Sequence, residues 1–336
     1  MFTDQLSFKA RPTGRKWFAG AARCALPLLM AWVALPAAAH NNNAYVANEV
    51  DNTVSVINTT TNAVTATVPV GTNPSGIAVS PNGASVYVAN LSSNNVSVIN
   101  AASNAVTATV AVGSSPDSVA VSPNGADVYV ANSNANTVSV IAAASDAVIA
   151  TVPVGNNPNS VAVSPDGAHV YVANTNDNTV SVIATATNTV TATVPVGNSP
   201  FGVAAGPFGA RVYVANFGDN TVSVIDTSTN AVTATLPAGN GALGLAISPI
   251  GAPVYAANFN DNTVSVIDPI NKTVFATVPV GSSPESIAIS RNCARIYVAN
   301  ANSNSVSVIN PFTNKVIATV SVGSVPTAVA TQPQEW

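Results

Sequence analysis

Charged residues are scarce in this sequence. Only 7% of the 336 residues are Asp, Glu, Lys or Arg, whereas 47% are hydrophobic. The 10 basic residues are outnumbered by 14 acidic ones, and five of the basic residues fall within the first 23 positions. Without these five and Asp4, 13 acidic residues face 5 basic ones. Because an acidic surface repels phosphate backbones, we expect no nucleic acid partner.

The first 39 residues differ from all that follow. A basic start precedes an apolar run over Ala25–Leu35, and three alanines stand directly before His40. This order is typical of a secretory signal, and the run is too short to span a membrane comfortably. We therefore predict a cleavable signal peptide over residues 1–39. The mature chain, 40–336, is expected in the periplasm, in the medium or at the cell surface, with no transmembrane segment. An uncleaved anchor is the alternative.

Cysteine is nearly absent as well. Cys24 lies in the predicted signal, so Cys293 is the single thiol of the predicted mature chain. A disulfide framework is thereby excluded, and the exported domain must depend on its hydrophobic core. We expect Cys293 to be a thiol in a turn rather than a link between two chains.

Recognisable catalytic motifs are also missing. The sequence contains no G-x-S-x-G, H-E-x-x-H, paired C-x-x-C or phosphate-binding glycine loop. Of the two histidines, His40 lies at the predicted mature terminus and His169 lies beside a turn. We therefore predict no catalytic residue, no metal ligand and no cofactor.

A repeated unit of 42 residues is what the sequence does contain. No stretch has a helical period, and the second copy indicates four strands. They cover Gly76–Ser80, Ser85–Asn90, Val96–Asn100 and Ala105–Val112. Seven such units predict an all-β, seven-bladed β-propeller of four-stranded antiparallel blades. The tetrapeptide Tyr-Val-Ala-Asn, once Tyr-Ala-Ala-Asn, starts at Tyr45, Tyr87, Tyr129, Tyr171, Tyr213, Tyr255 and Tyr297.

The two ends of the repeated region complement each other. The first unit begins at its second strand, Ala44–Asn48, and Pro326–Thr331 supplies a lone first strand at the far end. We predict that the C-terminal strand completes the N-terminal blade and closes the ring. The middle residue of every innermost strand is alanine, which suits strands that converge on one axis.

The repeats resemble those of the YVTN-type β-propeller family, with Ala in place of Thr in the tetrapeptide. The resemblance covers about Asn43 to Gln332 and includes Asp-Asn-Thr-Val-Ser-Val-Ile, Pro-Val-Gly and Ser-Pro-Asp/Asn-Gly. It implies an exported or surface propeller from a prokaryote. It says little about activity, because this repeat occurs in proteins of differing function.

The residue that opens the innermost strand varies most between the copies. In a propeller this position surrounds one mouth of the central channel, where ligands commonly bind. Its polar members Asp117, Asn159 and Glu285 are candidate binding residues. Asp117 and Glu285 lie four blades apart, which argues against a shared metal or an acid–base pair. The seven residues are Ser75, Asp117, Asn159, Phe201, Leu243, Glu285 and Thr327.

Large apolar residues at this face are confined to two neighbouring units. Phe201 and Phe217 belong to the fifth blade, Leu243 and Phe259 to the sixth. An apolar patch of this kind is typical of a surface that binds a partner. The alternative is that each side chain folds against its own loop.

Asparagine-rich hairpins precede Val-Ser-Val-Ile in every unit. An Asp-Asn pair such as Asp177-Asn178 suggests a calcium ligand, but one carboxylate per loop is fewer than a tight site needs. Asparagine also accepts a left-handed φ and bonds to its own backbone, so a structural role in the turn is favoured.

These observations favour a non-catalytic monomer that binds a protein, a glycan or a small ligand on the face with the channel mouth. The alternative is a propeller enzyme, either a lactonase-like hydrolase or a dehydrogenase-type subunit, with Asp117, Asn159 and Glu285 as its polar residues. A surface or adhesion protein is a third possibility.

Overall fold

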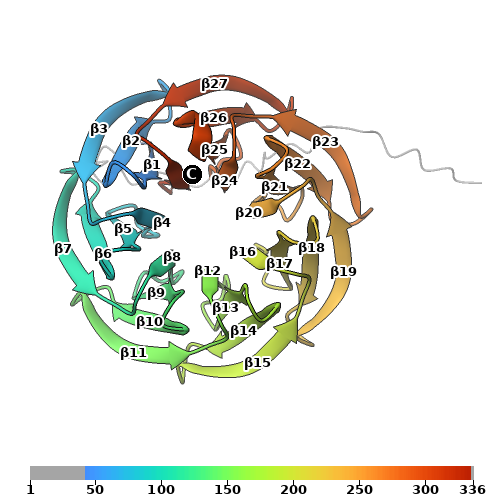
Figure 1. Cartoon of the computed structure of the whole chain (residues 1–336), viewed down its shortest axis with the longest axis horizontal. Helices are drawn as coiled ribbons and strands as arrows, with labels where there is room; N and C mark the ends of the chain where they lie inside the picture. Colours follow the sequence, from blue (N-terminus) through green and yellow to red (C-terminus); the bar gives the residue numbers. More distant parts are fainter. Residues whose placement is uncertain (1–41, 334–336) are drawn as a thin grey trace, which may run out of the picture.

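The computed structural model describes residues 42–333. It consists of 28 strands in seven four-stranded antiparallel sheets, or blades, arranged as a closed ring (Figure 1). Blade 1 contains β28, β1, β2 and β3, and blades 2 to 7 follow in chain order from β4 to β27. The fold class and the closure by the C-terminal strand, both predicted from the repeats, are therefore confirmed.

The strands occupy four concentric positions, in which each blade contributes one strand. The innermost strands are β28 (Pro326–Thr331), β4 (Pro74–Val79), β8 (Pro116–Val121), β12 (Pro158–Val163), β16 (Pro200–Ala205), β20 (Ala242–Ile247) and β24 (Pro284–Ile289). The second strands are β1 (Asn43–Asn48), β5 (Ser85–Asn90), β9 (Asp127–Asn132), β13 (His169–Asn174), β17 (Arg211–Asn216), β21 (Val254–Asn258) and β25 (Ile296–Asn300).

The outer two positions complete each blade. The third strands are β2 (Thr53–Asn58), β6 (Asn95–Asn100), β10 (Thr137–Ala142), β14 (Thr179–Ala184), β18 (Thr221–Asp226), β22 (Thr263–Asp268) and β26 (Ser305–Asn310). The outermost are β3 (Ala63–Pro69), β7 (Ala105–Ala111), β11 (Ala147–Pro153), β15 (Thr189–Pro195), β19 (Ala231–Pro237), β23 (Thr273–Pro279) and β27 (Lys315–Ser321). A short 3-10 helix, η1, covers Ala301–Ser303, and no helix among residues 42–333 has the length and apolar character needed to cross a membrane.

The hydrophobic core lies between neighbouring blades. Both faces of the second and third strands are buried, because each blade packs against the next on one face and against the previous on the other. Tyr129 of blade 3, for example, packs in one cluster with Val170 and Val172 of blade 4. The alanine of the innermost strand, Ala120, joins the same cluster, and its small side chain lets adjacent strands approach each other near the axis.

A buried asparagine ends the second strand of every blade. Its Nδ2 donates a hydrogen bond to the serine Oγ of Val-Ser-Val-Ile, so the two most constant motifs of the repeat are joined inside the core. The side chain of Asn174, for instance, lies 2.9 Å from Ser181 and is fully buried. The pairs are Asn48–Ser55, Asn90–Ser97, Asn132–Ser139, Asn174–Ser181, Asn216–Ser223, Asn258–Ser265 and Asn300–Ser307.

A second asparagine, in the hairpin between the second and third strands, joins each blade to the next. Its φ lies in the left-handed region, between 49° and 59° in the seven copies. Its Oδ1 accepts the backbone N–H of the residue that precedes the next innermost strand. The pairs are Asn52–Asn73, Asn94–Ser115, Asn136–Asn157, Asn178–Ser199, Asn220–Gly241, Asn262–Ser283 and Asn304–Val325.

The hairpin aspartates also serve the scaffold. Asp177 accepts hydrogen bonds of 2.7 Å from the backbone N–H and the side-chain amide of Asn156 in the preceding loop. Asp219 does the same with Asn198. Within residues 42–333 no three His, Cys, Asp or Glu side chains are grouped so that they could hold a metal ion. The structural interpretation of these hairpins is supported by these contacts.

Val325 is an exception among the seven residues that donate their backbone N–H to the hairpin asparagine of the previous blade. It has a φ of 53°, where the other six blades place Asn, Ser or Gly. A β-branched residue in the left-handed region costs about 1–3 kcal/mol. We expect Val325→Asn to raise the free energy of unfolding by about 1 kcal/mol, measured as a higher Tm. Asn157→Val, at the matching position of blade 4, should lower it; equal Tm values for both variants and the parent would contradict this.

Candidate functional site

The variable residue that opens each innermost strand projects into the central channel because the strand begins with a bulge. The residue before the strand has a left-handed φ in all seven blades. The strand's first residue then pairs with the buried asparagine, and the register shifts directly afterwards, as between Pro158 and Ser160. A bulge leaves its extra residue unpaired and redirects its side chain. Here that extra residue is Asn159, and blades 1, 2, 3 and 7 also leave one residue unpaired. Blades 5 and 6 leave two residues unpaired, and Phe201 and Leu243 are the first of each two.

These side chains surround a cavity of about 300 Å³, which we call the channel mouth. All seven blades contribute through their innermost strands, and the hairpins after β1 and β5 add Glu49 and Leu91. The two variable positions of the repeat therefore open on the same face, as predicted. The residues at the entrance are Glu49, Ser75, Leu91, Asp117, Asn159, Phe201, Leu243, Glu285 and Thr327.

Three carboxyl groups meet in the channel mouth. Burial raises the pKa of Asp117 to about 7; the negative charge of Glu49 contributes, and a hydrogen bond from Ser75 opposes the rise. Burial likewise raises the pKa of Glu285 to about 8, with further contributions from Glu49 and Asp117. Although Asp117 and Glu285 belong to blades 3 and 7, they line one cavity and each is affected by the charge of Glu49.

The remaining polar groups are held by the scaffold. Ser75 donates hydrogen bonds to the backbone oxygens of Pro116 and Asp117, at 3.1 and 3.0 Å. Asn159 donates from Nδ2 to Thr175 Oγ1 at 2.7 Å, so the orientation of its amide is set by its own blade. Asn159 lines the cavity with its amide held in this way.

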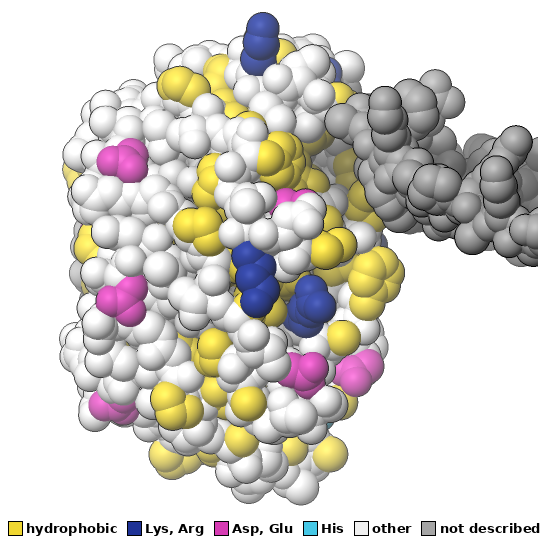
Figure 2. All heavy atoms as spheres, turned by 90° about the vertical axis from the view of Figure 1, so that its right-hand side faces the viewer, with side chains coloured by type: hydrophobic (Ala, Val, Ile, Leu, Met, Phe, Trp, Pro, Cys, Tyr) yellow, Lys and Arg dark blue, Asp and Glu magenta, His cyan; other side chains and the backbone are white. Residues whose placement is uncertain are grey.

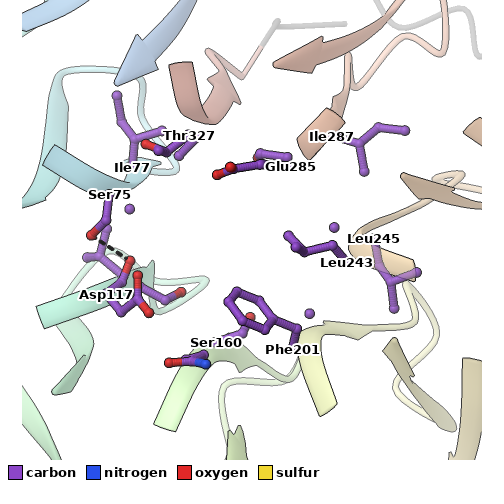
Figure 3. Close-up of a pocket in the computed structure, with 18 of the residues that line it drawn as sticks. Ser75, Ile77, Asp117, Ser160, Phe201, Leu243, Leu245, Glu285, Ile287 and Thr327 are labelled. Atoms are coloured by element: carbon purple, nitrogen blue, oxygen red, sulfur yellow. Dashed lines mark hydrogen bonds between the residues drawn. The ribbon is translucent and has the colours of Figure 1, made fainter. Parts of the chain in front are cut away.

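The apolar candidates divide into two pairs. Phe201 and Leu243 line the channel mouth, and Figure 3 shows both projecting toward its centre, across from Ser75 and Asp117. Phe217 and Phe259 do not line it; their rings pack against each other at 6.3 Å between centroids, tilted by 60°. All four side chains are half-buried. Blades 5 and 6 thus form one apolar wall, with the phenylalanine pair beside it.

The innermost strands that line the mouth also contact one another. Ser118 accepts the backbone N–H of Val161 on the next blade at 3.3 Å, and Ser160 and Ser286 make the same bond. Where glycine stands instead, the backbones come closer. A Cβ on Gly202 would lie 2.2 Å from the backbone oxygen of Leu243. The strands that carry the site are therefore tied to each other as well as to their blades.

Sequence reasoning missed Glu49 and Leu91 as lining residues. Both occupy the position after the Tyr-Val-Ala-Asn motif, the position that also supplies Phe217 and Phe259. Comparison of the seven copies shows that this position varies. It does not show which of the seven hairpins reach the channel, because that depends on the conformation of each hairpin. His169 and Cys293, for which the sequence predicts no functional role, do not line the mouth. His169 is exposed beside Tyr171 at the start of β13, and Cys293 is buried in a turn with a φ of 53°. His40 lies outside the described residues.

The channel mouth therefore offers hydrogen-bond acceptors on one side and hydrocarbon on the other. None of its lining residues is Lys, Arg, His or Cys. A carboxyl with a pKa near 7 can take up or release a proton at neutral pH, and a protonated carboxyl can donate a hydrogen bond.

Comparison with known proteins agrees with the architecture. The family model "Lactonase, 7-bladed beta-propeller" matches residues 36–148 and 145–237. No curated protein matches the chain in sequence. Hydrazine synthase of Kuenenia stuttgartiensis is similar in structure, with a TM-score of 0.74 and 24% identity over 79% of this chain and 91% of that chain.

Two other structures have the same fold at lower identity. A functionally unknown protein from Desulfotomaculum acetoxidans has a TM-score of 0.79 at 17% identity, covering 88% of this chain and all of that chain (100%). A candidate 6-phosphogluconolactonase from Bacteroides uniformis has a TM-score of 0.72 at 20% identity, covering 87% and 99%. At such identities the likeness establishes the fold alone.

The carboxyl groups of the mouth predict a dependence of stability on pH. The unfolded chain loses these protons near pH 3.8 and 4.5, whereas the native protein retains them to about pH 7 and 8. The free energy of unfolding should therefore fall as pH rises from 5 to 8, by at most about 1.4 kcal/mol per pH unit for each group. We expect Tm measured across this range to decline, and the decline to flatten in a variant with Asp117→Asn and Glu285→Gln.

Asp177→Asn is the matched control for this measurement. Backbone and side-chain hydrogen bonds from Asn156 lower the pKa of Asp177, so its contribution is lost only at more acidic pH and the decline from pH 5 to 8 should persist. A decline that is equally steep in the double variant would contradict the assignment.

Proposed function

The chain belongs to the seven-bladed lactonase β-propeller family, and within that family we propose that it binds a small ligand in the channel mouth without converting it. The observation that carries the proposal is the two-sided cavity. Its volume of about 300 Å³ is at the lower end of the range for small-molecule sites. A protein or a long glycan would engage only its rim.

The lining indicates the chemistry of the ligand. Phe201 and Leu243 suit a hydrocarbon ring or chain, while Asp117 and Glu285 suit a hydroxyl or amine that donates hydrogen bonds. Asn159 adds a neutral polar contact. We include Phe217 and Phe259 as the outer edge of the apolar wall, where a larger substituent would lie.

The absence of a cation from the lining supports binding over conversion. Attack on an ester or lactone carbonyl places negative charge on its oxygen, and that charge needs preorganised donors or a cation. Around the mouth such an oxygen would meet three carboxyl groups and no Lys, Arg or His. We further propose that the repeats are of the YVTN type, on the basis of their tetrapeptides.

Hydrolysis of a lactone is the second candidate, and one observation favours it besides the family. Glu285, whose pKa is near 8, is protonated at neutral pH and can donate to a carbonyl, while Asp117 with a pKa near 7 can accept a proton from water. Water oxygen would bond to the carbonyl carbon, the ring C–O bond would break, and the proton would pass to the departing oxygen, giving a hydroxy acid.

Binding is tested with arylalkyl amines and alcohols as probes, and with arylalkyl carboxylates of equal size as controls. The amines and alcohols should raise Tm, and the carboxylates should not, because the mouth is acidic. Phe201→Ser with Leu243→Ser should weaken probe binding by at least about tenfold in calorimetric titration, the equivalent of about 1.4 kcal/mol. Phe208→Ser, on the opposite face, should leave it unchanged.

Two results would overturn the binding proposal. One is probe binding that persists in the Phe201→Ser, Leu243→Ser variant. The other is turnover of γ- or δ-lactones, followed by proton release, that disappears in Asp117→Asn; that result would establish the hydrolase instead.

Export by the predicted signal is part of the proposal. The basic start, the apolar run and the three alanines before His40 support it. We expect the protein recovered from the periplasm or medium of an expressing bacterial cell to begin at His40, as read by intact mass and N-terminal sequencing. Replacing Leu28 and Leu29 with Arg should keep the protein in the cytoplasm with its first residues intact. A full-length chain in the exported fraction would show an uncleaved anchor.

A further inference from the structure

An apolar groove lies on the face opposite the channel mouth, where blades 5 and 6 meet. Its volume is about 330 Å³, and its walls come from the hairpin after β16, the hairpin after β20 and the hairpin after β22. Phe208 and Ile270 stand at its edges with 77% and 76% of their surface exposed, and Ile250 is 44% exposed. Isolated apolar side chains are ordinary on a surface, but three of them around a groove indicate an interaction site.

The groove itself is close to electrically neutral. Arg211 lies directly across from Asp226 in the β17–β18 pair. Hydrogen bonds from Ser228 lower the pKa of Asp226, and the charge of Arg211 adds to this effect. Lys272 and Asp268 share the hairpin after β22. Each positive charge beside the groove therefore has a negative one on the same blade.

The flanks of the groove carry opposite charges. All five basic side chains of residues 42–333 lie at this end of the blades, and three of them, Arg291, Arg295 and Lys315, belong to blade 7. On the other side of the groove, blades 3 and 4 carry Asp127, Asp146 and Asp166. Figure 2 shows Lys and Arg side chains among exposed hydrophobic side chains and a few acidic ones at this end of the blades, whereas the opposite rim shows only acidic charged side chains.

Around the ring the order is thus acidic, apolar, basic. A two-fold axis that lies in the plane of this face and passes between blades 5 and 6 places blade 5 of one copy against blade 6 of the other, and blade 4 against blade 7. The hairpin that carries Asp166 on blade 4 then meets the hairpin that carries Arg291 on blade 7. An isologous interface requires such self-complementarity. We propose that this face, centred on the groove, binds a second copy of the chain.

The pattern fits a second copy better than an anionic membrane. A flat anionic surface would be attracted to blade 7 but repelled by the three carboxylates of blades 3 and 4, and would find no net charge at the groove. Phe208 of blade 5, in contrast, meets the groove wall formed by Ile250 and Ile270 of the other copy. Both channel mouths then point outward, so the dimer presents two ligand sites on opposite sides.

The test is the mass of the full chain in solution, measured by sedimentation equilibrium from 1 to 100 μM. We expect a dimer with a dissociation constant in the micromolar range or below. Phe208→Asp with Ile270→Asp should raise that constant more than tenfold, with Tm unchanged because both side chains are exposed. Val50→Asp, at an apolar position of the mouth face that is 59% exposed, should leave it unchanged.

Charge reversal provides an independent arm. Arg291→Glu should weaken the dimer, as should Asp166→Lys, and both changes in one chain should restore it. A monomer at 100 μM, the state expected from the sequence, would overturn the proposal. Co-sedimentation of that monomer with 3:1 phosphatidylcholine–phosphatidylglycerol vesicles, lost on Phe208→Asp, would assign the groove to a lipid surface instead.

Discussion

The rest of the structure depends on one hydrogen bond between neighbouring blades. The residue that precedes each innermost strand donates its backbone N–H to the hairpin asparagine of the blade before it. The asparagine takes a left-handed φ and offers Oδ1 to the next backbone N–H in all seven blades. That N–H belongs to a residue which is itself left-handed, and the bulged start of the innermost strand follows. The same contact thus joins the blades and directs one side chain per blade into the channel mouth.

Much of the fold could be predicted from the sequence, because the seven copies of the repeat can be compared with one another. Seven copies at one spacing indicated the strands, and the lone strand Pro326–Thr331 indicated the closure. The innermost strand was placed two residues late in the second copy, at Gly76 instead of Pro74. The reason is that a proline followed by a bulge does not alternate like a regular strand. The role of the hairpin asparagine in its turn was foreseen, but its partner lies 21 residues away on the next blade and no local pattern reveals it.

The site was predictable only in outline. Variation between copies identified Asp117, Asn159, Phe201, Leu243 and Glu285, and all five line the cavity. The same reasoning could not separate Phe201, which faces the channel, from Phe217, which packs against Phe259. The bulge turns one residue of every innermost strand toward the axis, whereas only two of the hairpin residues, Glu49 and Leu91, line the cavity. The electrostatic effect of Glu49 on two blades at once likewise depends on distance, which sequence comparison does not contain.

Blades 5 and 6 are irregular at both ends. At the mouth their innermost strands skip two residues after the first pair, where the other blades skip one, and they carry Gly202 and Gly244 where blades 3, 4 and 7 carry serine. At the other end they hold the groove. Blades 5 and 6 are thus irregular at the channel mouth and also hold the groove on the opposite face.

The pairing of β1 with β28 has a consequence for the order of events in time. Ala44 lies beside Thr331, and Gln332 donates its N–H to Asn43, so the first blade lacks its innermost strand until almost the last described residue has been synthesised. Until then β1 has an open edge and the ring has a gap. Contacts between such distant residues form late. A polypeptide of this design cannot complete its ring while it is still emerging from the ribosome.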